Sequence, residues 1–380
     1  RVSMPCTDQK SYRTAVIGGG CAGLTLARHL TAAGVSPLAV IDPGASRSDH
    51  IWGYWDDGGA NLSLPRPLSS ASWRRWAVIT ERQKVVLNGD RFCYRALSSQ
   101  HYEESLRSDI SDSSGTFVNA TAKSCTPTKD GFRLTLDNDF ELSAEAVFDS
   151  RPPKPPVGAL LQHFGGWHVR MERPVFDPKT AILMDFRVSQ DEGIHFIYLL
   201  PFNAEHALVE STVFSPTPKS SEWYDSQIKA YLSEHYSGVQ ATIEGREAGV
   251  IPLAPLVSPN SFGTAIGLRA ATHRASSGYA FSQIQIQAAD LALDLIADRP
   301  ACPRPGCDSF EAWMDNVFLT VLRRSPDRAP EIFLRAARAL TGDQFATFMR
   351  GQSGWPTRLR LMSGLPLVLF LSAALDRGSR

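Results

Sequence analysis

The stretch TAVIGGGCAGLTLARHLTAAGVSPLAVID, Thr14 to Asp42, decides the fold of this chain. It begins with a short apolar run typical of a β-strand and continues through glycines spaced G-x-G-x-x-G. Apolar residues at helical spacing follow, and a second apolar run predicts another strand, which ends at Asp42. The order of strand, glycine turn, helix, strand and acid predicts a βαβ unit that binds a dinucleotide.

Each glycine of the turn has a physical task. Gly18 allows the tight turn, Gly20 lets the backbone approach a pyrophosphate, and Gly23 lets the helix pack closely on the strand. Cys21 and Ala22 complete the turn, and the free N–H groups and positive dipole of the helix N-terminus favour phosphate. These five residues are therefore predicted to bind the cofactor.

Asp42, at the end of the second strand, is placed to accept hydrogen bonds from a ribose. No second glycine fingerprint follows the one that begins at Gly18. We therefore expect one tightly held FAD and no separate nicotinamide domain.

Composition limits the possible function classes. The 380 residues contain 39 Lys plus Arg and 39 Asp plus Glu, and 43% of them are hydrophobic. This balance is typical of a globular protein with a core, and it argues against a nucleic-acid binder, which would normally be basic. The six cysteines are too scattered for a disulfide framework or a zinc site, so no metal is expected.

The segment 152–156 carries four prolines and marks the clearest boundary in the chain. After it, four strand-like runs separated by turns predict an antiparallel sheet: 167–171, 181–188, 195–201 and 207–214. From Phe310 onward the pattern is helical. Other local predictions are a loop at 46–67, a single strand at 76–87, a strand-then-glycine pattern at 266–278 and a helix at 279–297.

Six segments of the chain resemble the flavin-dependent lycopene cyclase family. They are VIGGGCAGLTLARHL (16–30), HIWGYWDD (50–57), FDSRPP (148–153), QHFGGWHV (162–169), MDFRVSQDEGIHFIYLLPFNAEHALVESTVFS (184–215) and RASSGYAF (274–281). The fifth segment is the most specific, and only the first is shared widely with other flavoproteins. The similarity covers nearly the whole chain.

The resemblance implies an α/β (α+β) fold of the hydroxylase and geranylgeranyl reductase type. This fold has a Rossmann-type FAD-binding domain, an antiparallel-sheet substrate domain and a helical C-terminal part. The expected boundaries are 11–155 for the first part of the FAD domain, 156–258 for the sheet domain, 259–300 for the return segment and 301–380 for the helical region. In the return segment, Gly267, Ser276, Ser277 and Gly278 are expected to contact FAD, although Ala275 replaces the family's usual proline.

The resemblance also implies a reaction without net oxidation or reduction. Reduced FAD is bound, with NAD(P)H as the candidate reductant, and a terminal double bond of an acyclic polyene such as lycopene is protonated. The resulting cation closes an end ring and then loses a proton. Such chemistry requires an acid that stays protonated in an apolar pocket, because burial raises the pKa of a carboxyl group.

Glu210 is the predicted general acid. It lies in the apolar strand sequence LVEST, where burial of an unpaired carboxylate is costly, and it matches the first acid of the family's acidic motif. Ser211 stands where the family has a second acid, which argues against a two-carboxylate mechanism. The alternative for Glu210 is a solvated strand residue. Five aromatic residues are candidates to line the substrate pocket: Trp52, Tyr54, Trp55, Phe196 and Tyr198.

Two other function classes remain as alternatives. One is a redox flavoenzyme on the same scaffold, such as a monooxygenase, halogenase or prenyl reductase. The other is a flavin- or carotenoid-binding protein without chemistry. A polyene substrate dissolves in membranes, so a membrane surface is an expected partner.

The segment 365–375 is apolar but shorter than the ~18 to 20 residues of a membrane span. It is interpreted either as a buried helix or as a patch that touches the bilayer, with Arg358, Arg360 and Arg377 as further contacts. The first ten residues are polar and do not resemble a signal peptide. We therefore expect a cytoplasmic protein with peripheral membrane association.

Overall fold

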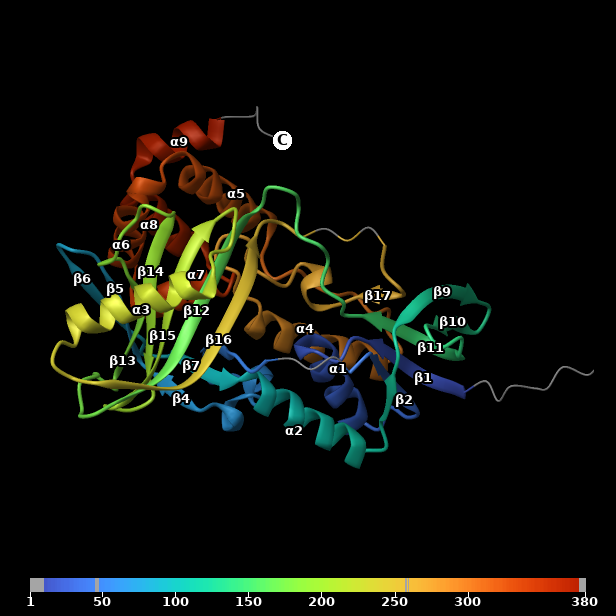
Figure 1. The fold of residues 1–380 in the computed structure, drawn as a ribbon. Coiled ribbons are helices and arrows are strands. Elements are labelled where there is room, and N and C mark those ends of the chain that lie inside the picture. The colour runs from blue at the N-terminus through green and yellow to red at the C-terminus, as the bar shows by residue number, and fades with distance from the viewer. Residues whose placement is uncertain (1–9, 45–47, 257, 259, 376–380) are drawn as a thin grey trace, which may run out of the picture.

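The computed structural model describes residues 10–44, 48–256, 258 and 260–375. Figure 1 shows two sheet-based layers side by side, with helices gathered at one end above the second layer. The start of the predicted loop at 46–67 and Arg377 lie outside the described residues.

The first sheet carries the βαβ unit that the glycine motif predicts. Its strand order is β8-β2-β1-β11-β10-β9, with β17 also paired to β11. The strands β8, β2, β1 and β11 run parallel, whereas β10 and β9 form an antiparallel extension. The bounds are β1 Lys10–Ile17, β2 Leu38–Asp42, β8 Thr116–Asn119, β9 Ala122–Thr128, β10 Gly131–Leu136, β11 Glu141–Asp149 and β17 Thr264–Ala265.

Three helices share an apolar core with this sheet, because each buries one face rich in leucine, isoleucine or alanine. They are α1 Cys21–Ala32, α2 Ser99–Asp112 and α4 Phe281–Ile296. The first helix begins directly after the glycine turn, as the motif predicts.

The second sheet has the strand order β16-β12-β15-β14-β13-β5-β6. All its neighbours pair antiparallel except β13 and β5, which are parallel. The bounds are β5 Arg75–Ile79, β6 Lys84–Asn88, β12 Leu160–Met171, β13 Thr180–Asp185, β14 Ile194–Pro201, β15 His206–Ser215 and β16 Ala241–Leu253. A third, small sheet has the order β3-β7-β4, with bounds Ile51–Asp56, Cys93–Ser98 and Ala71–Trp73 respectively.

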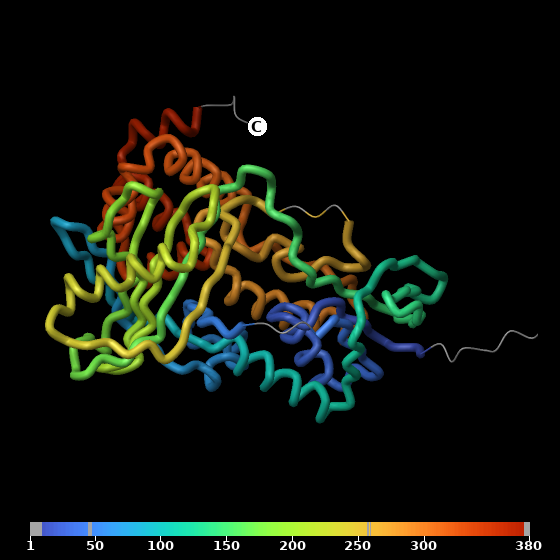
Figure 2. The backbone as a smooth tube through the Cα atoms, in the orientation of Figure 1, coloured from blue at the N-terminus to red at the C-terminus, as the bar shows by residue number. Residues whose placement is uncertain are grey.

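Helices cover both faces of the second sheet. Helix α3 (Ser221–His235) packs on β12 and β15, where Gly165 leaves the space that Tyr224 occupies. The opposite face looks toward the C-terminal helices α5 Ser309–Arg324, α6 Ala329–Ala339, α7 Gly342–Met349, α8 Trp355–Gly364 and α9 Leu367–Leu375. Figure 2 shows how the red C-terminal end of the chain returns to the blue hairpin β5–β6, which α6 contacts.

The structure confirms the predicted fold class and corrects several local predictions. The predicted loop at 46–67 contains β3, whose central glycine and acidic end resemble a turn in sequence. The single strand at 76–87 is the hairpin β5–β6, closed by hydrogen bonds between Thr80 and Gln83. At 266–278 the short strand β17 comes earlier, and Gly267–Ala270 forms a single 3₁₀ turn.

The second sheet draws on more of the chain than the four predicted runs. Strand β16 and helix α3 were not predicted, and the hairpin β5–β6 comes from inside the segment 11–155. The domain boundaries proposed from the sequence stay predictions.

Candidate active site

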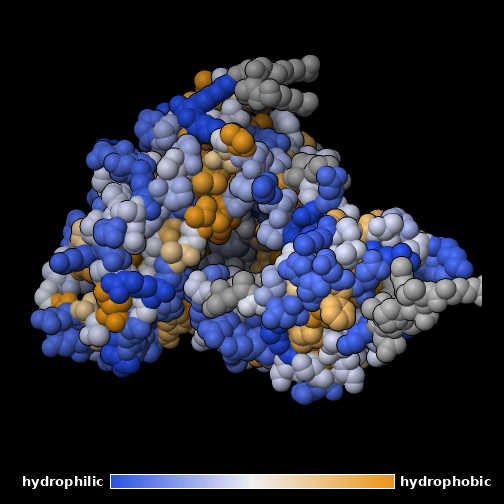
Figure 3. All heavy atoms as spheres, turned by 45° about the vertical axis from the view of Figure 1, so that its right-hand side comes forward, coloured by the Kyte–Doolittle hydropathy of each residue, from blue (hydrophilic) through white to orange (hydrophobic). Residues whose placement is uncertain are grey.

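A cavity of about 530 Å³ lies between the second sheet, the glycine-motif helix and the C-terminal helices. Figure 3 shows apolar surface gathered around a hollow in this part of the molecule. The cavity reaches the start of α1 at Cys21 and extends to α9 at Phe370 and Leu371. Its walls are mostly apolar and aromatic, and its volume is in the range of small-molecule sites.

One row of residues crosses four adjacent strands on the cavity side of the sheet. Tyr198 of β14 pairs with Glu210 of β15, Glu210 pairs with Gly166 of β12, and Gly166 pairs with Glu247 of β16. Directly paired residues in a sheet project to the same face, so the two carboxyl groups flank the glycine. A Cβ at Gly166 would lie 2.9 Å from the Cγ of Glu210 and 3.2 Å from that of Glu247.

Glu210 lines the cavity and is only 7% exposed, so it is not the solvated residue of the alternative interpretation. Burial, the nearby Glu247 carboxylate and a hydrogen bond to that carboxylate raise the pKa of Glu210 well above its usual range. Within residues 10–44, 48–256, 258 and 260–375, no Lys, Arg or His side chain forms an ion pair with it. Glu210 is therefore held as a neutral acid that can donate a proton.

Ser211 faces away from the cavity. Its hydroxyl is hydrogen-bonded to Nε2 of His195 at 2.9 Å, on the side of the sheet that α3 covers. Because successive strand residues point to opposite faces, an acid at this position would not reach the cavity beside Glu210. The carboxylate beside Glu210 belongs instead to Glu247. The presence of Ser211 is therefore no argument against a pair of carboxyl groups at this site.

Three buried tyrosines join the cavity wall next to Glu210. The Tyr94 hydroxyl is hydrogen-bonded to that of Tyr198 at 2.5 Å and to that of Tyr279 at 3.0 Å. Burial raises the pKa of all three phenols well above the usual value, so they stay neutral. Gly53 is required beside them, because its Cβ would lie 1.8 Å from the Tyr94 hydroxyl oxygen.

The glycine turn has the geometry of a dinucleotide site. Gly18 has a φ of +99°, and a Cβ at Gly23 would lie 1.9 Å from the carbonyl oxygen of Gly18. The Asp42 carboxylate accepts hydrogen bonds from the N–H groups of Gly19 (2.6 Å) and Gly44 (2.9 Å). These contacts place the acid at the turn, where the two ends of the βαβ unit meet.

The return segment packs on the same turn. Gly267 has a φ of +62°, and a Cβ there would lie 2.5 Å from that of Ala22. Ser276, Ser277 and Gly278 line the cavity. The Ser277 hydroxyl is buried without a hydrogen-bond partner, which fits a group that binds a ligand.

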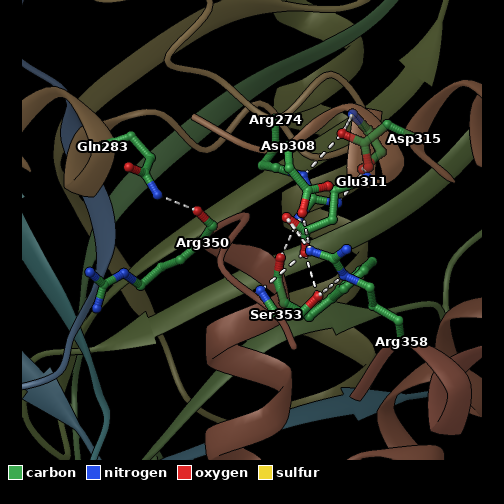
Figure 4. A network of polar contacts seen from close by, with 10 residues as sticks. Arg274, Gln283, Asp308, Glu311, Asp315, Arg350, Ser353 and Arg358 are labelled. Atoms are coloured by element: carbon green, nitrogen blue, oxygen red, sulfur yellow. Dashed lines mark hydrogen bonds and ion pairs between the residues drawn. The ribbon is translucent and has the colours of Figure 1, made fainter. Parts of the chain in front are cut away.

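Ser276 has a structural partner that the sequence does not indicate. Its hydroxyl donates to Asp315 of α5 at 2.8 Å, and the buried Arg274 guanidinium binds the same carboxylate at 2.5 Å. Figure 4 shows how these groups continue into a polar network that also contains Glu311, Ser353 and Arg358. This network attaches the return segment to the C-terminal helices.

The predicted pocket residues divide into two groups. Trp52, Phe196 and Tyr198 line the cavity. Tyr54 and Trp55 are each 1% exposed and belong to the apolar cores, so their prediction as pocket residues is wrong. The last three residues of strand β3 are buried in the core, so both rings are enclosed there. In the predicted loop the same rings could have turned toward a ligand.

Sequence reasoning missed Glu247, Tyr94 and Tyr279. Glu247 lies in β16, a strand that was not predicted. Glu244, Arg246 and Ala248 are exposed on one face of this strand, and Glu247 falls on the other face. This alternation is the only hint of a buried acid. Among the described residues, no group of three or more His, Cys, Asp or Glu is placed to hold a metal ion.

Helix α9 is mostly uncovered, with only Ala373 buried, so the interpretation as a buried core helix is wrong. Leu367, Val368, Leu371 and Leu375 are 51–81% exposed. In the described part of the chain no single helix could span a membrane by length and hydropathy. Only α8 and α9 together would pass this test, and they are bent by 111° relative to each other.

Arg358 is not available to a membrane, because it is buried and its guanidinium contacts Asp308 at 2.6 Å. Its neighbour Arg360 is exposed.

Solved structures that share this fold include proteins described as flavoprotein or flavin-dependent. A geranylgeranyl bacteriochlorophyll reductase-like protein from Thermoplasma acidophilum superposes with a TM-score of 0.61 at 11% identity, over 96% of this chain and 98% of that one. The p-nitrophenol 4-monooxygenase of Pseudomonas putida has a TM-score of 0.57 at 12% identity, over 97% and 98% of the two chains. At these identities the likeness shows the fold alone.

Sequence relatives point to one family. The lycopene beta-cyclase of Pantoea ananas is 23% identical over 96% of this chain and 97% of its own length. That of a Paracoccus species is 28% identical over 61% of this chain, and the match spans 64% of the relative. The family model "Lycopene cyclase protein" matches residues 14–372. The resemblance predicted from the six segments is therefore confirmed, and the chain belongs to the lycopene cyclase family.

Proposed function

We propose that this protein is an FAD-dependent cyclase that closes an end ring of a linear polyene such as lycopene, without net oxidation or reduction. Glu210 donates a proton to a terminal double bond of the substrate. The carbocation is attacked by a neighbouring double bond, and the ring that forms loses a proton. Family membership and the two cyclase relatives support this reaction class.

The observation that carries the proposal is the state of Glu210. It is a buried acid with a raised pKa in the wall of an apolar cavity. Protonation of an alkene requires such an acid, because a solvated carboxyl group is ionised near neutral pH and has no proton to donate, and because water would trap the cation. The proton therefore leaves the Glu210 carboxyl directly into a cavity shaped for a hydrocarbon.

The aromatic walls suit the cation that follows. Tyr198 and Trp52 line the cavity, and aromatic faces attract cations. The three linked phenols stay neutral, so they contribute dipoles and no protons that compete with Glu210. Phe196, Phe214 and Phe333 continue the apolar wall and exclude water.

The cofactor would be held by the glycine turn and the return segment. Gly18 and Gly23 shape the turn for a pyrophosphate at the start of α1, Asp42 is placed for a ribose, and Ser277, whose hydroxyl has no hydrogen-bond partner, is a lining residue of the cavity. Reduced FAD, kept reduced by NAD(P)H, would supply negative charge beside the cation.

A membrane surface is the proposed source of substrate. The exposed apolar surface of α9 is continuous with the lining of the cavity, because Leu367 and Leu371 are both exposed and part of that lining. A hydrocarbon that leaves a bilayer at α9 would thus meet apolar side chains all the way to the cavity. Arg360, an exposed residue in the middle of α8, is the proposed contact for lipid headgroups.

Glu210→Gln tests the acid. Purified protein with FAD and a reductant, without oxygen, is given lycopene in liposomes, and products are analysed by mass. We expect wild-type product of the same mass as lycopene with one or two rings, and at least a 100-fold lower rate for Glu210→Gln. Unchanged cyclisation by the variant would refute the acid, and an oxygen added to the product in a parallel assay run in air would favour a monooxygenase.

The membrane proposal has its own test. Val368→Asp places a charge on α9 outside the cavity lining, and Phe140→Asp places one on the exposed β10–β11 turn at the other end of the molecule in Figure 1. We expect Val368→Asp to reduce co-sedimentation with liposomes several-fold and Phe140→Asp to leave it unchanged. Equal binding by both variants and the wild type would refute the proposed surface.

A further inference from the structure

With substrate in the cavity, Glu210 can exchange protons with water only through its neighbours on the sheet. It is 7% exposed, and it lines the cavity that the substrate would fill. The carboxyl group must be protonated from solvent before the first turnover and again after any loss of its proton. The question is which groups carry them.

The row of paired residues continues from Glu210 to the surface. The Glu210 carboxyl is hydrogen-bonded to Glu247, whose side chain is 1% exposed. Oε2 of Glu247 lies 2.7 Å from Nε2 of His168, and the His168 side chain is 32% exposed. His168 and Gly166 lie two residues apart on β12, so they share the cavity-side face of the sheet.

The Glu247 side chain is held in place by a backbone N–H group outside the second sheet. Its Oε1 accepts a hydrogen bond from the N–H of Ile51 at 3.1 Å, at the start of β3. The His168 ring is stacked on Phe202, with 6.3 Å between ring centroids and 8° between planes. The orientations of Glu247 and His168 are therefore fixed. Oε2 of Glu247 points to His168 and Oε1 points to the backbone of Ile51. A proton route requires such fixed partners.

We infer that Glu247 and His168 form a proton route between Glu210 and bulk water. Water protonates the His168 imidazole at its other ring nitrogen, the imidazolium passes its Nε2 proton to Oε2 of Glu247, and a proton moves from the Glu247 carboxyl to Glu210. The isomerisation itself stays proton-neutral: one proton leaves the carboxyl pair for the alkene, and one returns to the pair from the ring carbon. This inference rests on the proposed role of Glu210 as the acid.

Other titratable groups face the pair but do not offer a second route. Tyr94 of β7, Tyr198 of β14 and Tyr279 of the return segment lie on the Glu210 side, and the hydroxyl groups of Tyr198 and Tyr279 are hydrogen-bonded to that of Tyr94. His168 is the group that joins Glu247 to a partly exposed surface among the residues that the structure describes.

Glu247→Gln tests the carboxyl pair without substrate or cofactor turnover. The amide removes the neighbouring negative charge and donates a hydrogen bond to the Glu210 carboxylate, and both effects lower the pKa of Glu210. We expect the infrared band of the protonated carboxyl, identified by its loss in Glu210→Gln, to titrate about one pH unit or more lower in Glu247→Gln. Glu244→Gln, an exposed acid of the same strand paired to Arg170, is the control and should leave the midpoint unchanged. A midpoint that Glu247→Gln does not move would overturn the pair.

His168 is tested through the rate at which the Glu210 carboxyl exchanges its proton with solvent. His168→Gln keeps a hydrogen-bond donor for Glu247 but carries no proton, and His168→Ala leaves a half-open space. After transfer to heavy water, we expect the infrared band of the protonated carboxyl to shift to its deuterated position at least 10-fold more slowly in both variants than in the wild type, and added imidazole to restore the rate in His168→Ala. An unchanged exchange rate in His168→Gln, or no rescue by imidazole, would overturn the route. Wild-type protein that forms no cyclic product would refute the proposed function, and the infrared midpoints would still decide the carboxyl pair.

Discussion

Glu210 and Glu247 project from the two strands that flank β12, and the glycine between them, Gly166, leaves the space that their side chains fill. Neither carboxyl would be close to the other if β12 carried a side chain at this point. The acid of the site is thus defined by three strands together, and its pKa depends on their register.

Gly166→Ala should disturb this pair. The new Cβ would lie 2.9 Å from the Glu210 Cγ, closer than ordinary contact, so the carboxyl groups must move apart. We expect at least a 10-fold loss of cyclase activity with FAD binding retained, measured by product formation and flavin absorbance. Gly245→Ala is the matched control, because its Cβ would meet His168 at an ordinary 3.5 Å. Equal activities of the two variants would contradict the argument.

Gly23→Ala should abolish the cofactor site. Its Cβ would lie 1.9 Å from the Gly18 carbonyl oxygen, and backbone atoms cannot give way as a flexible side chain can. We expect the dissociation constant for FAD to rise at least 10-fold, measured by flavin fluorescence. Gly354→Ala, whose Cβ would have only an ordinary contact of 3.7 Å with Pro356, should bind FAD normally. Normal FAD affinity of Gly23→Ala would place the cofactor elsewhere.

Asp315→Asn should destabilise the attachment of the C-terminal helices. Arg274 is 1% exposed, and removal of its main anionic partner leaves a buried charge insufficiently paired. Such losses typically cost about 3–5 kcal/mol. Urea unfolding followed by circular dichroism measures this cost. The control is Glu331→Gln, an exposed partner of Arg328, for which we expect a change below about 0.5 kcal/mol. Similar unfolding midpoints for both variants would contradict the network's role.

His163 and His195 should lower the stability of the fold as the pH drops below neutrality, whereas Glu210, whose pKa is raised, acts in the opposite direction. Burial lowers the pKa of both His163 and His195 from 6.5 to about 4. Between these values the unfolded chain binds more protons than the folded one, so the free energy of unfolding decreases from about pH 6.5 toward pH 4. Each histidine contributes roughly 3 kcal/mol at most to this decrease.

Urea unfolding at pH 7, 6 and 5 measures the effect. His195→Gln should lose part of the pH dependence, whereas His101→Gln, on the exposed side of α2, should keep all of it. The same pH dependence in His195→Gln as in the wild type would be the contrary result.

Local patterns in the sequence predicted much of the fold and part of the site. The spacing of Gly18, Gly20 and Gly23 predicted the βαβ turn, because each glycine answers a steric demand within a few residues. Glu210 was predicted as the acid because it matches the first acid of the family's acidic motif and because a charged residue inside an apolar strand is unusual. The prediction was wrong where a segment carries mixed signals. The glycine and acids around β3 indicated a loop, but the segment is a strand whose residues Tyr54 and Trp55 are buried in the core.

The sequence by itself determined the dinucleotide turn, the strand that carries Glu210 and the family to which the chain belongs. Only the tertiary structure decided that Ser211 faces helix α3, that Glu247 stands beside Glu210, and that His168 links this pair to the surface. The physical reason is the range of the interactions involved. Turn geometry and strand period act between near neighbours in the chain, whereas the pairing of β12 with both β15 and β16 brings together residues that the sequence separates by dozens of positions.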